Sequence, residues 1–301
     1  MRIDLHMHST ASDGSLTPTA LVALVKSRRV DMMALTDHDT TAGVAEAQEA
    51  ARRAGIRFVP GVEISTRWGG VVIHIVGLGI DPAHAGLSAF LEGICRQRES
   101  RGALMAERFE AIGIHGSFEG AMRLAQNKAT LSRTHFARWL HNTGHVRQYQ
   151  EAFDKYLKEG RPCCVTMAWP RIEEAVRLIH EAGGLAVLAH PGRYPFRNDW
   201  MLDQLLVDFK DAGGDAIEVS SGSQSEEHNR YCAAAARRMG FLASGGSDFH
   251  AETGVRPLPG DEAPLPADIP SVVEKLAAGD ERHSEMLPSV DGAENLLRTT
   301  L

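Results

Sequence analysis

The feature that most constrains this chain is the recurrence of His, Asp or Glu directly after short apolar segments of strand type. Seven such segments are expected to be strands, at residues 2–5, 32–35, 56–64, 71–78, 185–189, 216–219 and 241–244. Helical patterns separate most of them, which predicts a mostly parallel α/β arrangement. The carboxyl ends of parallel strands meet at one edge, where α/β sheets and barrels place their active sites. We therefore expect the acidic and imidazole side chains to converge there.

The alternation stops between residues 86 and 161, where the pattern predicts only helices. A long helix runs through residue 108, and shorter ones lie near residues 119–125, 134–141 and 148–157. We expect residues 86–161 to be an all-helical insertion, and residues 1–85 and 162–301 to form one catalytic unit. The other helices are expected to begin after Thr17, a good N-cap, and to span residues 41–54, 170–182, 199–212 and 225–239. Five prolines between residues 257 and 270 predict a loop, followed by a short helix and a tail.

Composition limits the classes of function. The 301 residues are 43% hydrophobic and 24% charged, which is typical of a folded protein. Without an apolar run of about 18 residues or a signal-peptide pattern, we expect a cytoplasmic protein with no membrane contact. The formal net charge of −7 excludes a basic protein that coats duplex DNA. The four cysteines form no CxxC pair and are expected to be reduced, so neither a disulfide framework nor a thiolate zinc site is predicted.

Nine side chains at or near the strand ends form a candidate metal centre. His6 and His8 are separated by one residue, as are Asp248 and His250, so each pair points to one side of an extended segment. Imidazole and carboxylate ligands together suit Zn, Mn or Fe. The candidates are His6, His8, Asp13, His38, Glu63, His74, His190, Asp248 and His250. One metal accepts about four to six ligands, so nine predict more than one metal, with Glu63 or Asp248 as a bridge.

One member of this set and several residues outside it have simpler interpretations. His74 is expected inside a strand and could be a buried histidine with a structural role. Asp37 is expected to orient a ligand by hydrogen bonding, and Asp39 to cap the helix that follows it. The remaining histidines, at positions 84, 115, 141, 145, 180, 228 and 283, are expected at the surface. The metal centre is therefore predicted from the set rather than from any one member.

Several arginines of the expected insertion could bind a phosphate. Arg98, Arg101 and Arg108 fall near one face of the long helix, and Arg133 and His135 follow on the next segments. A guanidinium group binds phosphate through two parallel hydrogen bonds. A helical lid with such groups above a metal cluster would suit a substrate with two phosphates. A solvated helix face remains the alternative for the three arginines of the long helix.

The segments that carry these residues resemble the polymerase-and-histidinol-phosphatase (PHP) family of metal-dependent phosphoesterases. The matching segments are Asp4-Leu5-His6-Met7-His8-Ser9, Ser12-Asp13-Gly14, Thr36-Asp37-His38-Asp39, Pro60-Gly61-Val62-Glu63, Ala189-His190-Pro191 and Ser247-Asp248-Phe249-His250. The resemblance implies a distorted seven-stranded (β/α) barrel with a trinuclear metal centre. It would assign His6, His8, Glu63 and Asp248 to one metal, Glu63, His74 and His190 to the second, and Asp13, His38 and His250 to the third. Asp13 stands where some members have His.

Within the family, the chain is similar to small bacterial members with a helical insertion. The segments Leu131-Ser132-Arg133-Thr134-His135-Phe136-Ala137-Arg138 and Tyr156-Leu157-Lys158-Glu159-Gly160-Arg161-Pro162 resemble motifs of that insertion. The resemblance implies removal of the 3′-phosphate from nucleoside 3′,5′-bisphosphates such as adenosine 3′,5′-bisphosphate, and relatives trim short RNA from its 5′ end. The expected substrate contacts are Asp13, Arg101, Ser132, Arg133, Thr134, His135, Arg193 and His250.

The expected reaction is metal-assisted hydrolysis. Three divalent ions, with Mn²⁺ preferred and Zn²⁺, Fe²⁺ or Mg²⁺ as alternatives, would carry a bridging hydroxide near Glu63, His190 and Asp248. Asp13, His250 or a metal-bound water would donate the proton to the leaving oxygen. The expected partner is a small phosphorylated nucleotide or, alternatively, a short RNA.

Four alternatives remain open at this point. They are a 5′-3′ exonuclease, a phosphatase of the histidinol-phosphate type, amide or ring hydrolysis of the amidohydrolase kind, and a non-catalytic metal-binding regulatory module. Amidohydrolase chemistry usually needs a carbamylated lysine, and no lysine is expected at a strand end. A P-loop and a G-x-S-x-G nucleophile elbow are both absent from the sequence.

Overall fold

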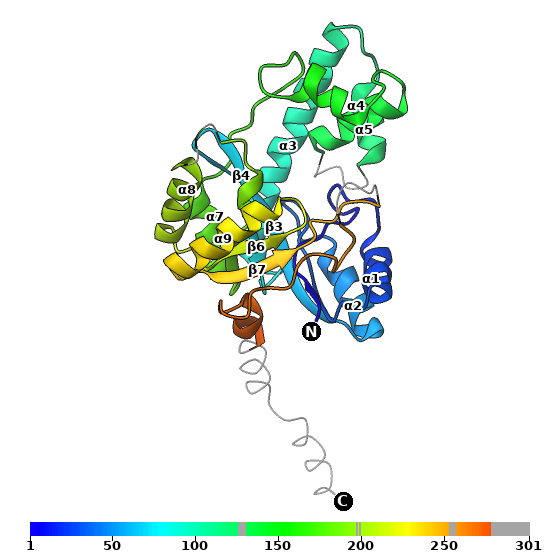
Figure 1. Cartoon of the computed structure of the whole chain (residues 1–301). Coiled ribbons are helices and arrows are strands. Elements are labelled where there is room, and N and C mark those ends of the chain that lie inside the picture. Colours follow the sequence, from blue (N-terminus) through cyan, green and yellow to red (C-terminus); the bar gives the residue numbers. More distant parts are fainter. Residues whose placement is uncertain (126–130, 197, 199, 253–256, 278–301) are drawn as a thin grey trace, which may run out of the picture.

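Seven strands, paired in chain order, form the centre of the molecule (Figure 1). The computed structural model describes residues 1–125, 131–196, 198, 200–252 and 257–277. The strands are β1 (Ile3–Asp4), β2 (Met32–Leu35), β3 (Arg57–Trp68), β4 (Val71–Leu78), β5 (Leu185–Leu188), β6 (Ala216–Ser221) and β7 (Leu242–Gly246). The Leu5 N–H donates to the Gly245 carbonyl over 3.1 Å, and Met7 pairs with Phe249 in a parallel bridge. Because these contacts join the first strand to the last, the sheet closes into the distorted barrel that we expected.

The barrel is less parallel than the alternation of strands and helices predicts. Strand β4 runs antiparallel to both β3 and β5, while the other neighbours are parallel. The reason is local: Gly69 and Gly70, with φ of 55° and 84°, join β3 directly to β4 in a tight hairpin turn. A hairpin of this length can connect only antiparallel strands. The amino end of β4 therefore lies at the same edge as the carboxyl ends of the parallel strands.

Helices cover the outside of the barrel (Figure 1). They are α1 (Pro18–Ser27) and α2 (Val44–Ala54) on one side, and α7 (Ile172–Glu181), α8 (Trp200–Asp211) and α9 (Glu226–Met239) on the other. Thr17 caps α1 as predicted, because its side chain accepts from the Ala20 N–H, and Gly55 ends α2 with a φ of 67°. The predicted helix 199–212 agrees with α8, although residue 199 lies outside the described residues, as does the expected tail from residue 278 onward.

The predicted helical block forms a separate lobe above the barrel in Figure 1. It contains α3 (Ala85–Ala111), α4 (Ser117–Leu124), α5 (Arg133–Asn142), α6 (Tyr149–Ala152) and the π-helical turn η2 (Phe153–Leu157). The first half of α3 packs on the barrel's core through Leu87 and Ile94, whereas its second half belongs to the lobe's own core. There the Phe109 and Phe136 rings stack with centroids 5.9 Å apart. No helix of the described residues combines the length and apolar character needed to cross a membrane.

Alternation along the strands determines what the barrel interior contains. Val76 of β4 and Ala216 of β6 belong to a buried apolar cluster inside the barrel. His74 and Glu218 lie two residues nearer the carboxyl edge on the same strands, so they point to the same interior. The inside of the barrel is therefore apolar at one end and ionisable at the other.

Candidate metal centre

All nine predicted ligands converge at the carboxyl edge of the barrel. Their nitrogen and oxygen atoms fall into four overlapping groups, and within each group the donor atoms lie within 4.8 Å of one another. The groups are His8, Asp13, His38 and His250; His6, His8 and Asp248; His6, Glu63 and His190; and His38, Glu63 and His74. The groups share His6, His8, His38 and Glu63, so the nine residues form one continuous centre that could hold several metal ions.

Glu63 lies at the middle of this centre and is completely buried. Its Oε1 lies 2.9 Å from His74 Nδ1 and 3.1 Å from His190 Nε2. Its Oε2 faces the other histidines, at 3.3 Å from His6 Nε2, 3.2 Å from His8 Nε2 and 2.9 Å from His38 Nδ1. The two oxygens therefore face different sets of imidazoles, which is the arrangement that a carboxylate bridging two cations requires.

A second carboxylate, Asp248, lies near His6 and His8, which also face Glu63. Its Oδ1 lies 3.3 Å from His8 Nε2 and 3.5 Å from His250 Nδ1. The Nε2 atom of His250 lies 3.4 Å from Asp13 Oδ1, and the His8 and His250 rings are 4.1 Å apart. Asp13 thus joins the same centre from the loop after β1.

Many of the buried nitrogen and oxygen atoms that could coordinate a metal have no hydrogen-bond partner within the part of the chain that the structure describes. They are Nε2 of His6, both ring nitrogens of His8, Oδ1 of Asp13, Nδ1 of His38, Oε2 of Glu63, Nδ1 of His74 and Nδ1 of His190. Leaving one buried polar atom without a partner costs about 1–3 kcal/mol. Natural proteins keep such groups where they coordinate metals. The donor set of nitrogen and carboxylate oxygen therefore fits divalent transition-metal ions.

The local charges favour the ionised form of the carboxylates. Burial raises the pKa of Glu63, but His38 and the other facing imidazoles outweigh burial and hold this pKa well below its usual range. Burial likewise opposes ionisation of Asp13, while His250 and His38 lower its pKa. Burial lowers the pKa of His8, but the nearby carboxylates of Asp248 and Glu63 outweigh burial and raise it to about 9. The centre is thus built to hold positive charge beside ionised carboxylates.

Asp37 supports the loop that carries Asp13, and the ligand-orienting role predicted for it would act through this loop. One of its oxygens accepts from the Ser9 N–H at 2.7 Å and from the Ser12 hydroxyl at 2.6 Å. The other accepts from the Ser9 hydroxyl at 2.7 Å. These three bonds fix the turn between His8 and Asp13.

The prediction that Asp39 caps a helix is wrong. Gly43, which has no side chain, precedes α2 instead. Asp39 is completely buried; its Oδ1 accepts from the Ser65 N–H at 2.7 Å, and its Oδ2 accepts from Arg98 Nε at 2.7 Å and from Arg98 Nη2. Arg98 of α3 is therefore a buried ion-pair partner and not a member of a solvated helix face.

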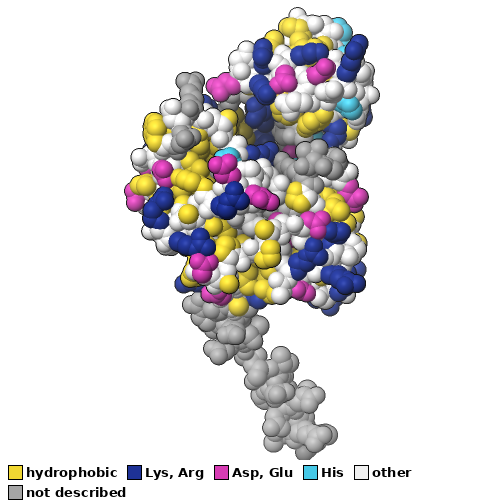
Figure 2. Space-filling view, viewed as in Figure 1, with side chains coloured by type: hydrophobic (Ala, Val, Ile, Leu, Met, Phe, Trp, Pro, Cys, Tyr) yellow, Lys and Arg dark blue, Asp and Glu magenta, His cyan; other side chains and the backbone are white. Residues whose placement is uncertain are grey.

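Two other arginines of the predicted phosphate-binding set line a cavity of about 280 Å³ between the helical lobe and the β3–β4 hairpin. Arg101 and Arg133 share this cavity with Arg67, Glu159 and Trp169. Arg101 is 7% exposed, its Cζ lies 5.4 Å from the centroid of the Trp169 ring, and its Nε has no partner among the described residues. Burial and the neighbouring charges of Arg98 and Arg133 lower the pKa of Arg101 to about 9. Figure 2 shows basic side chains in the hollow between the helical lobe and the barrel.

The remaining predicted substrate contacts have mixed environments. Ser132 and His135 form a capping box at the start of α5, in which the Ser132 N–H donates to His135 Nδ1 at 3.1 Å, so His135 also has a structural role. Thr134 is half-buried on the same turn. Arg193 has a side chain that is 44% exposed, and its Nη1 donates to Asp248 Oδ2 at 3.0 Å. Arg108 is exposed and donates to the Cys164 carbonyl.

Two further residues of the site escaped the sequence analysis. Glu218 accepts from His6 Nδ1 at 2.6 Å and from the His190 N–H at 2.8 Å. The Tyr194 hydroxyl donates to the Ala189 carbonyl and accepts from the His74 N–H, both at 2.9 Å. An acidic residue inside the apolar segment of β6, on its inward face, is the signal that could have identified Glu218.

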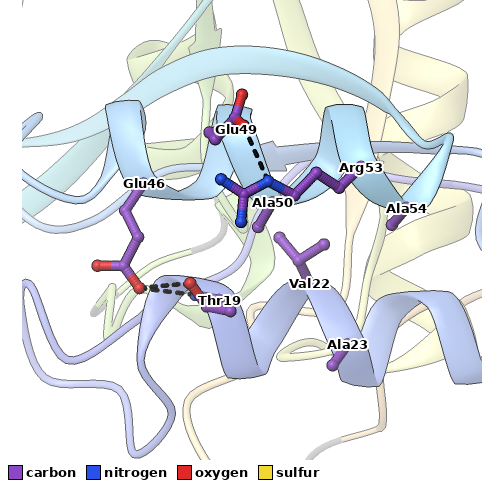
Figure 3. Close-up of a pocket in the computed structure, with 8 residues that line it drawn as sticks. All are labelled: Thr19, Val22, Ala23, Glu46, Glu49, Ala50, Arg53 and Ala54. Atoms are coloured by element: carbon purple, nitrogen blue, oxygen red, sulfur yellow. Dashed lines mark hydrogen bonds and ion pairs between the residues drawn. The ribbon is translucent and has the colours of Figure 1, made fainter.

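A groove of about 450 Å³ between α1 and α2 lies outside the barrel (Figure 3). Its acidic residues are already bound: Glu46 accepts from the Thr19 N–H and hydroxyl, and Glu49 accepts from Arg52 and Arg53. Its floor consists of short apolar side chains, including Val22, Ala23 and Ala50. It offers no cluster of nucleophilic or metal-ligating groups.

Comparison with known proteins identifies the family. Residues 4–185 match the family model described as the PHP domain. The chain belongs to the PHP domain family. It is 49% identical over 249 residues to a 3′,5′-nucleoside bisphosphate phosphatase of Chromobacterium violaceum, covering 83% of this chain and 87% of that protein. It is 47% identical over 249 residues to the 5′-3′ exoribonuclease Rnm of Salmonella typhimurium, covering 82% and 84%.

The fold has a near neighbour among solved structures. A protein of Chromobacterium violaceum, described as an amidohydrolase with bound sulfate and no metal, superposes with a TM-score of 0.87 at 46% identity, over 92% of this chain and 96% of that one. The predicted family and barrel fold are therefore confirmed. The chain is accordingly a phosphoric ester hydrolase of this family, as predicted.

Proposed function

We propose that this enzyme removes the 3′-phosphate from nucleoside 3′,5′-bisphosphates, releasing a 5′-mononucleotide and phosphate. The observation that carries the proposal is the pairing of a nine-ligand centre with a separate cavity, between lobe and barrel, that is lined by three arginines and one glutamate. A substrate with two phosphates would use both, one at the centre and one in the cavity. The name of the Chromobacterium violaceum relative agrees with this substrate.

The centre would hold three divalent ions, with Mn²⁺ as the preferred metal. Glu63 would bridge two of them, since its two oxygens face different histidines, and Asp13, His38 and His250 would hold the third. Bound divalent cations supply two things in phosphate ester hydrolysis: a water of lowered pKa and neutralisation of the phosphoryl oxygens. Support for this assignment comes from the buried donor atoms that lack partners in the described structure.

Residues 86–161 would act as the lid that binds the second phosphate. Arg101 is buried, and its Nε has no hydrogen-bond partner in the part of the chain that the structure describes, in contrast to Arg98, whose charge is balanced by Asp39. An uncompensated guanidinium next to Arg133 favours an anion in the cavity. Arg193, half-exposed beside Asp248, would contact the phosphate that is cleaved. His250 lies 3.4 Å from Asp13 and is the residue proposed to donate the proton to the leaving oxygen, with the ionised Asp13 orienting it.

A second candidate function is 5′-3′ exonucleolysis of short RNA, favoured by the name of the Salmonella typhimurium relative. It uses the same chemistry, because both substrates carry a 5′-phosphate and an ester at the 3′-oxygen. A phosphatase of the histidinol-phosphate type would not need the cationic cavity. Amidohydrolase chemistry is poorly supported, because no barrel strand that the structure describes carries a lysine.

A phosphate-release screen with added Mn²⁺ tests the proposal. The substrates are a nucleoside 3′,5′-bisphosphate, a 5′-mononucleotide, histidinol phosphate, an aryl phosphate and a short 5′-phosphorylated RNA. The Arg133→Ala variant should lose at least about tenfold in kcat/KM on the bisphosphate, as expected for one charge-assisted hydrogen bond, and much less on the aryl phosphate. Equal losses of kcat/KM on both substrates would contradict the proposal that residues 86–161 bind the second phosphate.

A further inference from the structure

Glu218 is a buried carboxylate that contacts two parts of the metal centre at once. It lies on the inward face of β6, and the residue is 1% exposed. Its Oε1 lies 2.6 Å from His6 Nδ1, and its Oε2 accepts from the backbone N–H of His190 at 2.8 Å. We infer that Glu218 is a positioning residue that presents His6 and His190 to the metal ions. This inference rests on the metal centre proposed above.

The contact with His6 determines which ring nitrogen is available. A carboxylate oxygen only accepts hydrogen bonds, so the Nδ1 atom of His6 carries the proton. The Nε2 atom then faces Glu63 Oε2 at 3.3 Å and Asp248 Oδ1 at 3.6 Å. A neutral imidazole binds metal through the nitrogen that carries no proton, and a carboxylate on the other nitrogen fixes the ring and makes it more basic.

The contact with His190 stabilises an unusual backbone conformation. His190 has φ 32° and ψ 58°, in the left-handed region that non-glycine residues rarely adopt. Its N–H donates to Glu218, and its Nε2 lies 3.1 Å from Glu63 Oε1. The Glu218 side chain therefore holds this turn in the conformation that directs the imidazole of His190 toward the centre.

Glutamine at position 218 has nearly the same shape but cannot satisfy both groups. An amide has one oxygen, so either His6 Nδ1 or the His190 N–H would face an NH₂ group. If the NH₂ faces His6, the proton moves to Nε2, the nitrogen that faces the centre. We therefore expect Glu218→Gln to bind Mn²⁺ about 10- to 100-fold more weakly than the wild type.

Asp215, on the residue before β6, offers a matched control. Its Oδ2 also accepts from one imidazole and one backbone N–H, those of His180 and Ala186, both at 2.8 Å. It lies three residues before Glu218, toward the apolar end of the barrel. Asp215→Asn therefore removes the same kind of contact without touching the centre, and it should keep the wild-type affinity for Mn²⁺.

The experiment titrates chelator-treated wild type and variants with Mn²⁺ by calorimetry and records their metal-free melting temperatures. If Glu218→Gln binds Mn²⁺ as tightly as the wild type, the inference is overturned. A lower metal-free melting temperature together with unchanged Mn²⁺ affinity would show that Glu218 has a purely structural role. If Glu218→Gln does not fold, Glu218→Asp replaces it; this side chain keeps the charge but is one methylene too short to reach both groups, and the same loss is expected. A wild type that binds no divalent cation would instead overturn the proposed metal centre and this inference with it.

Discussion

The Asp39–Arg98 pair allows a quantitative test of how the helical lobe is attached to the barrel. Asp39 follows β2 beside the proposed ligand His38, and Arg98 lies on α3, which enters the lobe. The side chains are 0% and 7% exposed, respectively. Arg98→Met removes the guanidinium, whose Cζ lies 4.9 Å from the centroid of the Trp169 ring, but keeps most of the apolar stem.

The expected loss follows from the burial of the partner left behind. Without Arg98, the carboxylate of Asp39 stays inside the protein with the Ser65 N–H as a hydrogen-bond donor. Breaking a buried ion pair by removing one member costs about 3–5 kcal/mol. In a chain of this size, 1 kcal/mol changes the melting temperature by about 2–4 °C, so we expect a decrease of about 6–20 °C.

Arg96→Met is the matched control, since it makes the same substitution two positions earlier on the same helix. The Arg96 side chain is 72% exposed and lies 3.7 Å from an equally exposed Glu92, so its loss should cost less than about 0.5 kcal/mol. Adding Asp39→Asn to Arg98→Met removes the stranded charge and should recover part of the stability. Thermal unfolding followed by circular dichroism measures all four proteins. Equal melting temperatures for the two single arginine variants would refute the reasoning.

Three further predictions concern the metal centre and the lobe. Glu63→Gln should reduce Mn²⁺ affinity by more than about 100-fold, measured by calorimetric titration. Changing a residue that only supports a metal ligand already costs up to about 100-fold, and Glu63 is proposed to bind the metal directly. Removing the metal with a chelator should abolish phosphate release. Restoring Mn²⁺ to 100 times its Kd should raise the free energy of unfolding by about 2.7 kcal/mol, which corresponds to an increase of about 5–11 °C in melting temperature. Gly120→Ala should destabilise the protein by about 1–3 kcal/mol, because the added Cβ would lie 1.9 Å from Trp139 Nε1. Gly93→Ala is the control: its Cβ would meet only Arg96, at 3.9 Å, so the change should be neutral or stabilise the protein by up to about 1 kcal/mol. Thermal unfolding measures both variants.

The sequence predicted the strands, the helical block and the set of candidate ligands because each depends on local patterns. His6 and His8 directly follow a strand-like segment. Such a position indicates the edge of a sheet from the local sequence alone, without knowledge of the tertiary structure. For His74, the strand pattern alone predicts a position inside a strand, away from a carboxyl end. The antiparallel direction of β4, which the turn at Gly69-Gly70 imposes, brings it to the correct edge.

The partners of these side chains could not be predicted in the same way. Asp39 is 59 positions from Arg98, and His6 is 212 positions from Glu218. No periodicity connects residues so far apart, so a helix cap was the simpler interpretation of Asp39. Only the closure of the barrel and the course of α3 bring these groups together. The sequence therefore indicates the atoms that could hold metals, while the groups that orient them depend on tertiary structure.

Backbone conformation shows why those orienting groups matter. Four non-glycine residues of the described structure have φ in the left-handed region, and three of them, Asp39, His190 and Asp248, lie just after β2, β5 and β7. A conformation of this kind costs about 1–3 kcal/mol and persists only where surrounding contacts enforce it. Here the Arg98 and Ser65 groups hold Asp39, Glu218 holds the His190 N–H, and the Asp248 N–H donates to the His6 carbonyl at 2.8 Å. The turns that aim two proposed ligands, His190 and Asp248, into the centre are thus stabilised by contacts from other strands, so the closed barrel itself determines the geometry of the site.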